Sequence, residues 1–313
     1  MKNPISFIQK AFLARASEIE KALNTIIAHR RGKGVPFRER LLYFLARFFY
    51  LFPIPSRFME NGIESLAHNL KLICSTSEGK IYEKNGLLFL IPKGYIRTFS
   101  EALQEIYLLS EYEEYPVEIE EGDIVIDCGA NIGVASLIFA RKVGLRGKVV
   151  AIEAEEANFR ILRRTAELNR GKVGEIIPLR YALYKENCEL KLFLSISPAS
   201  HSLYKNIEHK VIREALTNNF EVVQGKTLDS IIEELNLERV DFIKMDIEGG
   251  ELDALYGAKQ TIANFKPKMA VSIYHRPKDP IEIRKTLLQY NPDYECREIK
   301  KRERMLFCRR ATP

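Results

Sequence analysis

Two segments of similar design constrain the fold of this chain most strongly, residues 122–133 and residues 240–251. Each reads as a short apolar strand that ends in an acidic residue and glycine and runs on into a helix. In an open parallel sheet, the carboxyl ends of such strands form the crevice in which ligands bind. The two segments therefore predict an α/β sheet with a ligand site at that edge, and a nucleoside-type cofactor is the leading hypothesis.

The region from residue 122 onward alternates between expected strands and helices. We expect strands at 124–127, 148–153, 175–182, 189–194, 241–246 and 268–274, and helices at 132–142, 156–169, 228–235, 251–264 and 281–289. This alternation predicts right-handed βαβ crossovers and a doubly wound, mostly parallel sheet. Segments 294–299 and 304–308 flank a charged turn and predict a closing antiparallel hairpin. The long connection 195–221 is expected to be a lid or a binding loop.

Three parts are expected along the chain. Residues 1–75 are rich in helix formers and predict a helical accessory region. Residues 76–120 are expected to hold a hairpin, turning at Asn85-Gly86, and a helix near 100–111 that leads into the core. Residues 121–313 then form the cofactor-binding domain.

Positive charge gathers at the two ends of the chain. Lys and Arg outnumber Asp and Glu by 11 to 4 in residues 1–60 and by 7 to 2 in residues 297–313. Such ends suit an anionic partner, whether RNA, a membrane surface or a phosphorylated glycan carrier, or they are simply solvated surface. The apolar run near 38–52 is shorter than the ~20 residues of a membrane span. It predicts a buried helix or a peripheral membrane contact.

The five cysteines are widely spaced and form no CxxC pair. They argue for a reducing compartment, and against both a disulfide framework and a cysteine zinc site. The first residues make a poor signal peptide, because charged and polar side chains interrupt their apolar stretch. We therefore expect a cytoplasmic protein.

The turn after the first core strand carries the residues Asp127, Gly129, Asn131 and Gly133. Glycines let the backbone approach a ligand closely, and the free amides of a helix start bind anions. Glu153 ends the next strand, where an acid can accept both hydroxyls of a ribose. No GxxxxGK loop or GxGxxG run is present, which disfavours nucleoside triphosphates and dinucleotides. An acid before the loop suits the ammonium group of S-adenosylmethionine (SAM).

The chain resembles FkbM-type, class I SAM-dependent methyltransferases over roughly residues 120–275. The resemblance rests on DCGANIG at 127–133, on Glu153, on the triplet 227–229 and on DFIKMDIEGGELDALYGA at 241–258. It implies a Rossmann-like methyltransferase fold in which Asp127, Gly129, Asn131 and Gly133 line the methionine end of the cofactor. It also implies that Glu153 binds the ribose and that residues near Ala182 flank the adenine. Segment 272–279 is similar to the fifth-strand signature of a sugar-associated subgroup.

Two residues near the expected strand ends are candidates for acting on the methyl acceptor, Asp246 and His275, and His201 on the expected lid is a third. Other interpretations stay open: Asp246 could pair with Lys244, and His275 could be structural. Asp246, Glu248 and Glu251 form an oxygen-rich set that could hold Mg²⁺. We do not favour that interpretation, and we predict no metal site.

The leading functional prediction is transfer of a methyl group from SAM to a hydroxyl of a saccharide or glycoconjugate. An RNA methyltransferase that uses the basic termini is an alternative, although no RNA-binding module is recognisable. A non-catalytic scaffold that keeps the cofactor fold is another. A nucleotide-dependent oxidoreductase is the last.

Overall fold

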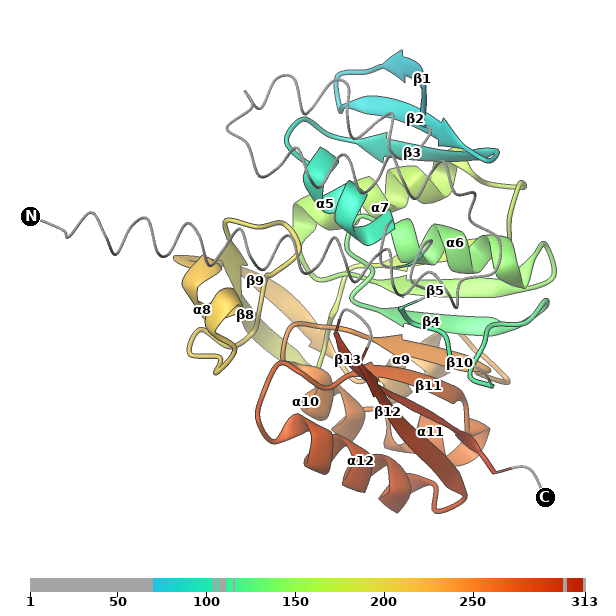
Figure 1. Cartoon of the computed structure of the whole chain (residues 1–313), viewed down its shortest axis with the longest axis vertical. Coiled ribbons are helices and arrows are strands. Elements are labelled where there is room, and N and C mark those ends of the chain that lie inside the picture. The colour runs from blue at the N-terminus through green and yellow to red at the C-terminus, as the bar shows by residue number, and fades with distance from the viewer. Residues whose placement is uncertain (1–69, 104–105, 107–110, 115, 301–302, 312–313) are drawn as a thin grey trace, which may run out of the picture.

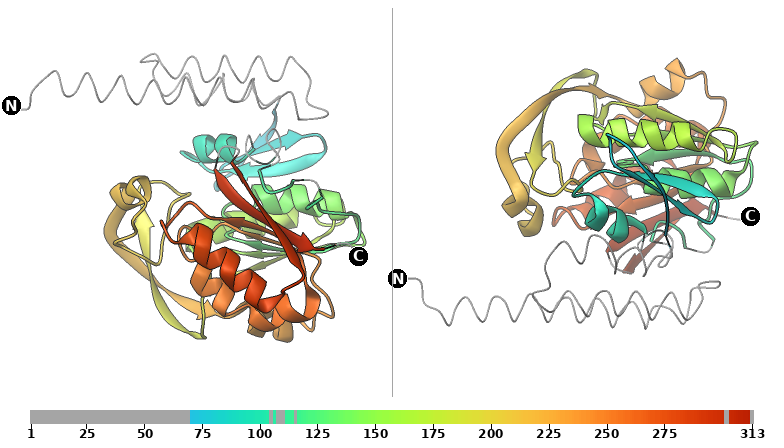
Figure 2. Two further views of the ribbon diagram at one scale, coloured as in Figure 1. Left: turned by 60° about the horizontal axis from the view of Figure 1, so that its bottom comes forward. Right: turned by 90° about the horizontal axis from the view of Figure 1, so that it is seen from above.

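The computed structural model describes residues 70–103, 106, 111–114, 116–300 and 303–311. A twisted central sheet carries helices on both faces, and a smaller sheet lies beside it near the start of the described chain (Figures 1 and 2). In this part of the chain, no helix combines the length and hydropathy that crossing a membrane requires. Residues 1–69 of the helical region expected over 1–75, and with them the expected peripheral membrane contact at 38–52, lie outside the described residues.

The central sheet has seven strands in the order β12-β13-β11-β10-β4-β5-β6. Its parallel strands are β4 (Ile124–Cys128), β5 (Lys148–Ile152), β6 (Glu175–Leu179), β10 (Phe242–Met245) and β11 (Lys268–Ser272). The strands β12 (Tyr294–Lys300) and β13 (Arg304–Arg310) close one edge as an antiparallel hairpin. The prediction of a Rossmann-like, mostly parallel sheet with a closing hairpin is confirmed. Because β4 and β10 are neighbours, the two sequence motifs end side by side.

Alternate residues of each strand face opposite helical layers. On β4, Val125 packs in the cluster that includes α6 (Val134–Val143), whereas Ile126 packs with the helices of the other face. The first face also carries α7 (Glu156–Leu168). The second carries α9 (Leu228–Glu234), α10 (Glu251–Tyr256), α11 (Lys259–Phe265) and α12 (Asp279–Tyr290). Strands buried on both faces explain their almost continuous apolar sequence.

The single helix expected at 251–264 is two helices, α10 and α11, that are separated at Gly257 and Ala258. A Cβ atom at Gly257 would lie 2.2 Å from the carbonyl oxygen of Tyr184. The carbonyl of Gly257 also accepts a hydrogen bond from the backbone N–H of Asp229. The helix is interrupted at the point where other segments of the chain contact its backbone. The periodicity of the sequence does not reveal such a contact.

The first described residues form a three-stranded sheet of β1 (Lys71–Ser75), β2 (Lys80–Lys84) and β3 (Leu87–Ile91), followed by α5 (Ile96–Leu103). The predicted tight turn is confirmed, since Asn85 and Gly86 have φ angles of 53° and 83°. Residues 71–75 are a strand, so the expected helical region does not extend to residue 75, and α5 begins before the expected start at Ser100.

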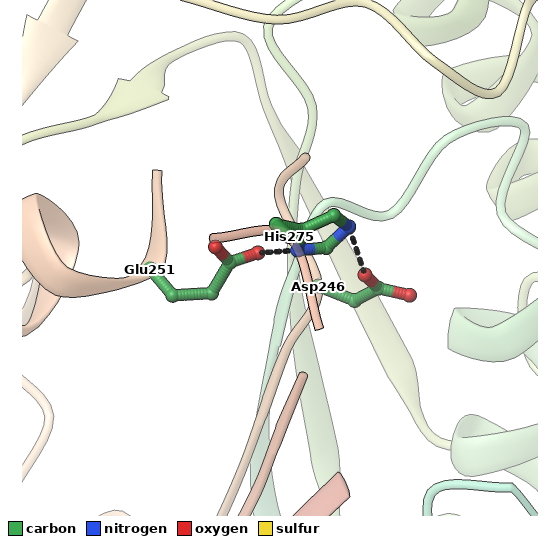
Figure 3. Close-up of side chains that lie close together, drawn as sticks. All are labelled: Asp246, Glu251 and His275. Carbon is green, nitrogen blue, oxygen red and sulfur yellow. Dashed lines mark ion pairs between the residues drawn. The ribbon is translucent and has the colours of Figure 1, made fainter. Parts of the chain in front are cut away.

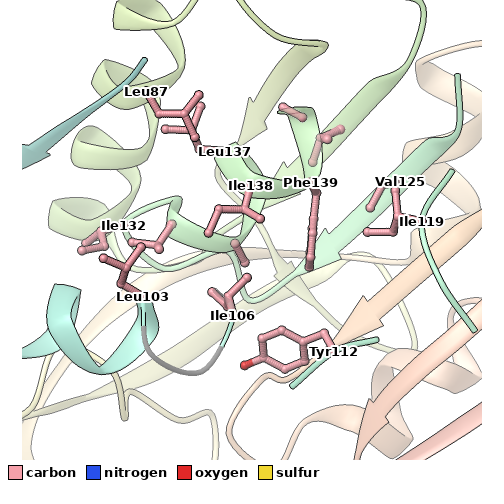
Figure 4. Close-up of a cluster of buried hydrophobic side chains, with 14 of the residues drawn as sticks. Leu87, Leu103, Ile106, Tyr112, Ile119, Val125, Ile132, Leu137, Ile138 and Phe139 are labelled. Atoms are coloured by element: carbon pink, nitrogen blue, oxygen red, sulfur yellow. The ribbon is translucent and has the colours of Figure 1, made fainter. Parts of the chain in front are cut away.

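The small sheet and α5 share one hydrophobic core with α6. Leu87 and Leu103 pack in the same cluster as Ile132, Leu137 and Phe139 (Figure 4). The side-chain amide of Asn169 adds two hydrogen bonds to the backbone of Leu88. The division of the chain at residues 75 and 120 stays a prediction.

A second small sheet of β7 (Ala182–Leu183), β9 (Leu216–Lys226) and β8 (Cys188–Ser195) forms an arm beside the core (Figure 1). The strand expected at 175–182 ends at Leu179, and Ala182 opens β7. The connection 195–221 is not a bare loop, because it contains α8 (Lys210–Ala215) and the first part of β9.

Cys296 and Cys308 form a disulfide between β12 and β13. The two residues lie opposite each other in the hairpin, with their Cα atoms 4.1 Å apart. The sequence argument against disulfides is wrong for this pair, because strand register and not CxxC spacing brings the cysteines together. The inference of a reducing compartment is no longer supported by the pattern of cysteines.

Candidate active site

A cavity of about 690 Å³ opens at the carboxyl ends of the parallel strands. Its wall includes the loop 129–132 after β4, Glu153 after β5, residues 246–248 after β10 and Tyr274 after β11. Residues 196–201, from the connection after β8, also line it. A more open surface hollow of about 920 Å³ lies beside α9 and α11 and contains none of the predicted site residues. The cavity at the strand ends is therefore the candidate site.

The loop after β4 has the backbone shape that the sequence predicted. Gly129, Asn131 and Gly133 have φ angles of 81°, 51° and 84°. A Cβ atom at Gly129 would lie 2.0 Å from the carbonyl oxygen of Asp246, so only glycine fits there. Gly129 and Asn131 line the cavity. A Cβ at Gly133 would instead meet Leu162 of α7, so this glycine allows the loop to pack on the helix behind it.

Glu153 is 9% exposed and lines the cavity. Its carboxylate accepts hydrogen bonds from the backbone N–H groups of Asn131, at 2.8 Å, and Glu155, at 2.9 Å. Burial raises the pKa of Glu153 to about 7, against the opposing effect of these two bonds. The carboxylate both holds the glycine loop and presents an acceptor to the cavity.

The connection after β8 is hydrogen-bonded to the loop after β4 and to α7 at the cavity wall. The carbonyl of Pro198 accepts from the side-chain amides of Asn131, at 2.9 Å, and Asn158, at 2.8 Å. His201 lines the cavity, but its Nδ1 already accepts from the backbone N–H of Ser195, and burial lowers its pKa. Ala182 is 4% exposed and lies on the cavity wall.

Asp127 lies behind the loop and not on the cavity wall. Its carboxylate is fully buried, forms an ion pair of 3.1 Å with Lys244 and accepts a 2.6 Å hydrogen bond from Ser136. Lys244 also donates to the carbonyls of Cys128 and Gly129. Pairing of Lys244 with Asp246 was one interpretation left open by the sequence. Asp127 pairs with Lys244 because the two residues are register partners on β4 and β10.

Asp246 follows β10 and lines the cavity. The hydroxyl of Tyr112 donates to its Oδ2 at 2.8 Å, while its Oδ1 is buried and has no hydrogen-bond partner. Burial raises the pKa of Asp246, but Lys244 and His275 outweigh it, so the pKa lies below its ordinary value. Asp246 is therefore ionised at neutral pH. Sequence reasoning missed Tyr112, which precedes the predicted domain and matches no motif.

His275 lies between carboxylates (Figure 3). Its Nδ1 is 3.0 Å from Oε1 of Glu251, and its Nε2 is 3.3 Å from Glu248 and 3.7 Å from Oδ1 of Asp246. Burial favours the neutral ring, but Glu251 and Glu248 raise the pKa of His275 well above its ordinary value. The direction of this shift favours the imidazolium form of the ring, and each nitrogen faces an acid. A protonated ring cannot accept the proton of an acceptor hydroxyl.

Asp246, Glu251 and His275 each offer a ligand atom within 4.8 Å of the others, as a metal site would. However, the ring stands between the two carboxylates, with Nδ1 toward Glu251 and Nε2 toward Asp246 (Figure 3). A metal needs the ligand atoms to point at one common position. The arrangement is that of a charged imidazolium held by acids.

Residues 127–295 match the model of the methyltransferase FkbM domain. The chain belongs to the FkbM methyltransferase family. The matched domain is a SAM-dependent methyltransferase, which confirms the resemblance seen in the sequence motifs. The match begins at Asp127, the last polar residue of β4, and runs into β12.

Individual relatives are distant. The hexuronic acid methyltransferase AglP of Haloferax volcanii is 26% identical over 193 residues, which are 62% of this chain and 73% of AglP. Methyltransferase 1 of Beauveria bassiana is 29% identical over 166 residues, 49% of this chain and 65% of the relative. The crystal structure of methyltransferase FkbM from Methylobacillus flagellatus aligns with a TM-score of 0.46 at 18% identity, over 94% of this chain and 60% of that one.

Proposed function

We propose that this chain transfers the methyl group of SAM to a hydroxyl of a saccharide or glycoconjugate. The observation that carries the proposal is the placement of Asp246, an ionised carboxylate on the wall of the cavity at the carboxyl ends of the strands. The name of AglP, a hexuronic acid methyltransferase, supports a sugar-type acceptor. The resemblance of segment 272–279 to a sugar-associated subgroup agrees with it.

The cavity wall fits the proposed cofactor. Gly129 lines the cavity and has no room for a side chain, because a Cβ atom would meet the carbonyl of Asp246. Glu153 presents a buried carboxylate to two adjacent hydroxyls such as those of a ribose. Asn131 and Ala182 complete this side of the cavity. Asp127 and Gly133 do not face the cavity; their role is to stabilise the loop from its other side.

SAM supplies a methyl group that its sulfonium activates, so the protein needs mainly to position the acceptor and to remove its proton. Bound SAM would give up its methyl carbon to the acceptor oxygen and leave as S-adenosylhomocysteine. The proton of the acceptor hydroxyl becomes acidic only as its oxygen bonds to the methyl carbon. A carboxylate of low pKa such as Asp246 is therefore a sufficient base. His275 lies 3.7 Å from Oδ1 of Asp246, where a charged ring favours the ionised carboxylate.

The rival functions have less support. The basic ends that favoured RNA lie largely outside the described residues, whereas the described cavity wall carries the carboxylates of Glu153, Asp246 and Glu248. These acids would repel a phosphate backbone. A scaffold without catalysis would not need an ionised carboxylate that is held in place by Tyr112 and His275.

The test is methyl transfer from labelled SAM to a panel of methyl glycosides of glucose, glucosamine and glucuronic acid, with unmodified transfer RNA as the rival acceptor. Product is read by mass spectrometry. The matched variant Asp246→Asn keeps the size of the side chain and removes the base. The proposal expects methylation of a sugar by the wild type, and loss of turnover with unchanged S-adenosylhomocysteine binding in the variant. Methylation of RNA alone would contradict it.

A further inference from the structure

Tyr112 stands between the two charged side chains that β10 brings to the cavity. Its hydroxyl donates to Oδ2 of Asp246 at 2.8 Å, and its ring centroid lies 5.0 Å from Nζ of Lys244. The residue is 6% exposed, lines the cavity and packs edge-to-face on Phe139 of α6. Packing therefore fixes the direction in which the hydroxyl points.

The two oxygens of Asp246 are held differently. Oδ1 is buried and faces Nε2 of His275, at 3.7 Å. Oδ2 carries the hydrogen bond from Tyr112, and the 14% of the side chain that is exposed does not include Oδ1. The oxygen that an acceptor reaches is thus the one that Tyr112 orients.

We propose that Tyr112 is a positioning residue of the methyltransferase, which sets the orientation of Asp246 for the acceptor hydroxyl. The inference rests on the role proposed for Asp246. It extends the active site beyond the matched family domain, because Tyr112 precedes residue 127 and belongs to the segment before β4.

The hydrogen bond has a direct consequence for the acid. A donor on a carboxylate stabilises the charged form, so Tyr112 lowers the pKa of Asp246 together with Lys244 and His275. Among the described residues, Glu248 and Tyr274 also lie close enough to interact electrostatically with Asp246, and Ser272 lies close enough to lower the pKa of Asp246 further. Tyr112→Phe removes one donor and leaves these groups in place.

The first test is a pH titration of the Asp246 carboxyl carbon by isotope-edited NMR, with Asp246→Asn to assign the signal. Tyr112→Phe should raise the titration midpoint. Tyr294→Phe is the matched control, since Tyr294 is 5% exposed and its hydroxyl donates to the carbonyl of Pro267 at 2.6 Å, away from the cavity. The control should leave the midpoint unchanged. An unchanged midpoint in Tyr112→Phe would overturn the inference.

The second test is kinetic and uses the glycoside that the wild type methylates. Losing a hydrogen bond to a charged group should lower kcat/KM of Tyr112→Phe about 10- to 100-fold. Measured on the residual activity of Asp246→Asn, the added Tyr112→Phe change should cost nothing further, because Tyr112 acts through that carboxylate. Losses that multiply would overturn the inference. Full activity of Asp246→Asn would contradict the roles of both Asp246 and Tyr112. An active Tyr112→Phe together with an inactive Asp246→Asn would contradict only the role of Tyr112.

Discussion

The carboxylate of Asp127 and the ammonium group of Lys244 form an ion pair of 3.1 Å inside the sheet, with side chains that are 0% and 3% exposed. The pair joins β4 to β10 directly below the cavity, and Lys244 also donates to the backbone of the glycine loop. The acid of the first motif and the lysine of the second thus form one structural unit. Its two charges neutralise each other, and Lys244 also donates to the loop and lines the cavity.

Removing one partner of this pair should strongly destabilise the protein. Lys244→Met leaves Asp127 as an uncompensated buried charge, and we expect a loss of about 3–5 kcal/mol in the free energy of unfolding. The double variant with Asp127→Leu should recover part of this loss. Urea denaturation measures the free energy of unfolding of each variant. The control is Glu121→Gln. Glu121 pairs with Arg146 on the surface, where both side chains are more than half exposed, and its loss should be small. Equal losses of stability in Lys244→Met and Glu121→Gln would contradict this account.

The sequence predicted the sheet and the glycine loop because both depend on local patterns. Short apolar strands that end in acid and glycine specify β4 and β10, and an Asn-Gly pair specifies the turn between β2 and β3. The pairing of Lys244 with Asp127 instead depends on strand register across 117 positions of sequence. Sequence periodicity carries no such information.

The acceptor side of the site was predicted only in part, for the same reason. Asp246 and His275 stand at strand ends, which sequence patterns place. The proton carried by His275 depends on Glu248 and Glu251, and the orientation of Asp246 depends on Tyr112. These are tertiary contacts that no motif contains.

Cofactor affinity should rise with pH through about 7. The pKa of Glu153 lies near that value, because burial raises it. Above pH 7 the carboxylate is ionised and accepts the ribose hydroxyls in charge-assisted hydrogen bonds; below it, the protonated acid accepts more weakly. Calorimetric titrations with S-adenosylhomocysteine between pH 6 and pH 8 measure the trend. Glu153→Gln should bind more weakly and lose the trend, and an equally steep trend in that variant would show that another group is responsible.

The glycine of the loop should tolerate no side chain. Gly129→Ala places a Cβ atom 2.0 Å from the carbonyl oxygen of Asp246, so the loop must move and S-adenosylhomocysteine affinity should fall by at least about tenfold. Gly122→Ala is the matched control, because Gly122 has a similar φ of 89° but no atom near the added carbon. We expect it to cost about 1–2 kcal/mol of stability and no affinity. Comparable affinity losses in both variants would argue against a close approach at Gly129.

His275 should stabilise the fold in a pH-dependent way. Its pKa in the folded protein lies well above the ordinary value of 6.5, so the folded state binds the proton more tightly than the unfolded chain. The stabilisation is complete below pH 6.5 and is lost as the pH rises through the folded pKa. The stability difference between the wild type and His275→Gln should thus be large at pH 6 and shrink in alkaline solution. Urea denaturation at several pH values measures it, and a difference that grows with pH would contradict a charged ring.

The central claim is that the cavity at the carboxyl ends of β4, β5 and β10 binds SAM. Calorimetric titration of the purified chain with S-adenosylhomocysteine, and separately with NAD, tests it most directly. We predict micromolar binding of S-adenosylhomocysteine, weakened by about 1–3 kcal/mol in Glu153→Ala, and no comparable binding of NAD. Absence of S-adenosylhomocysteine binding by the folded protein, or tighter binding of NAD, would contradict the claim.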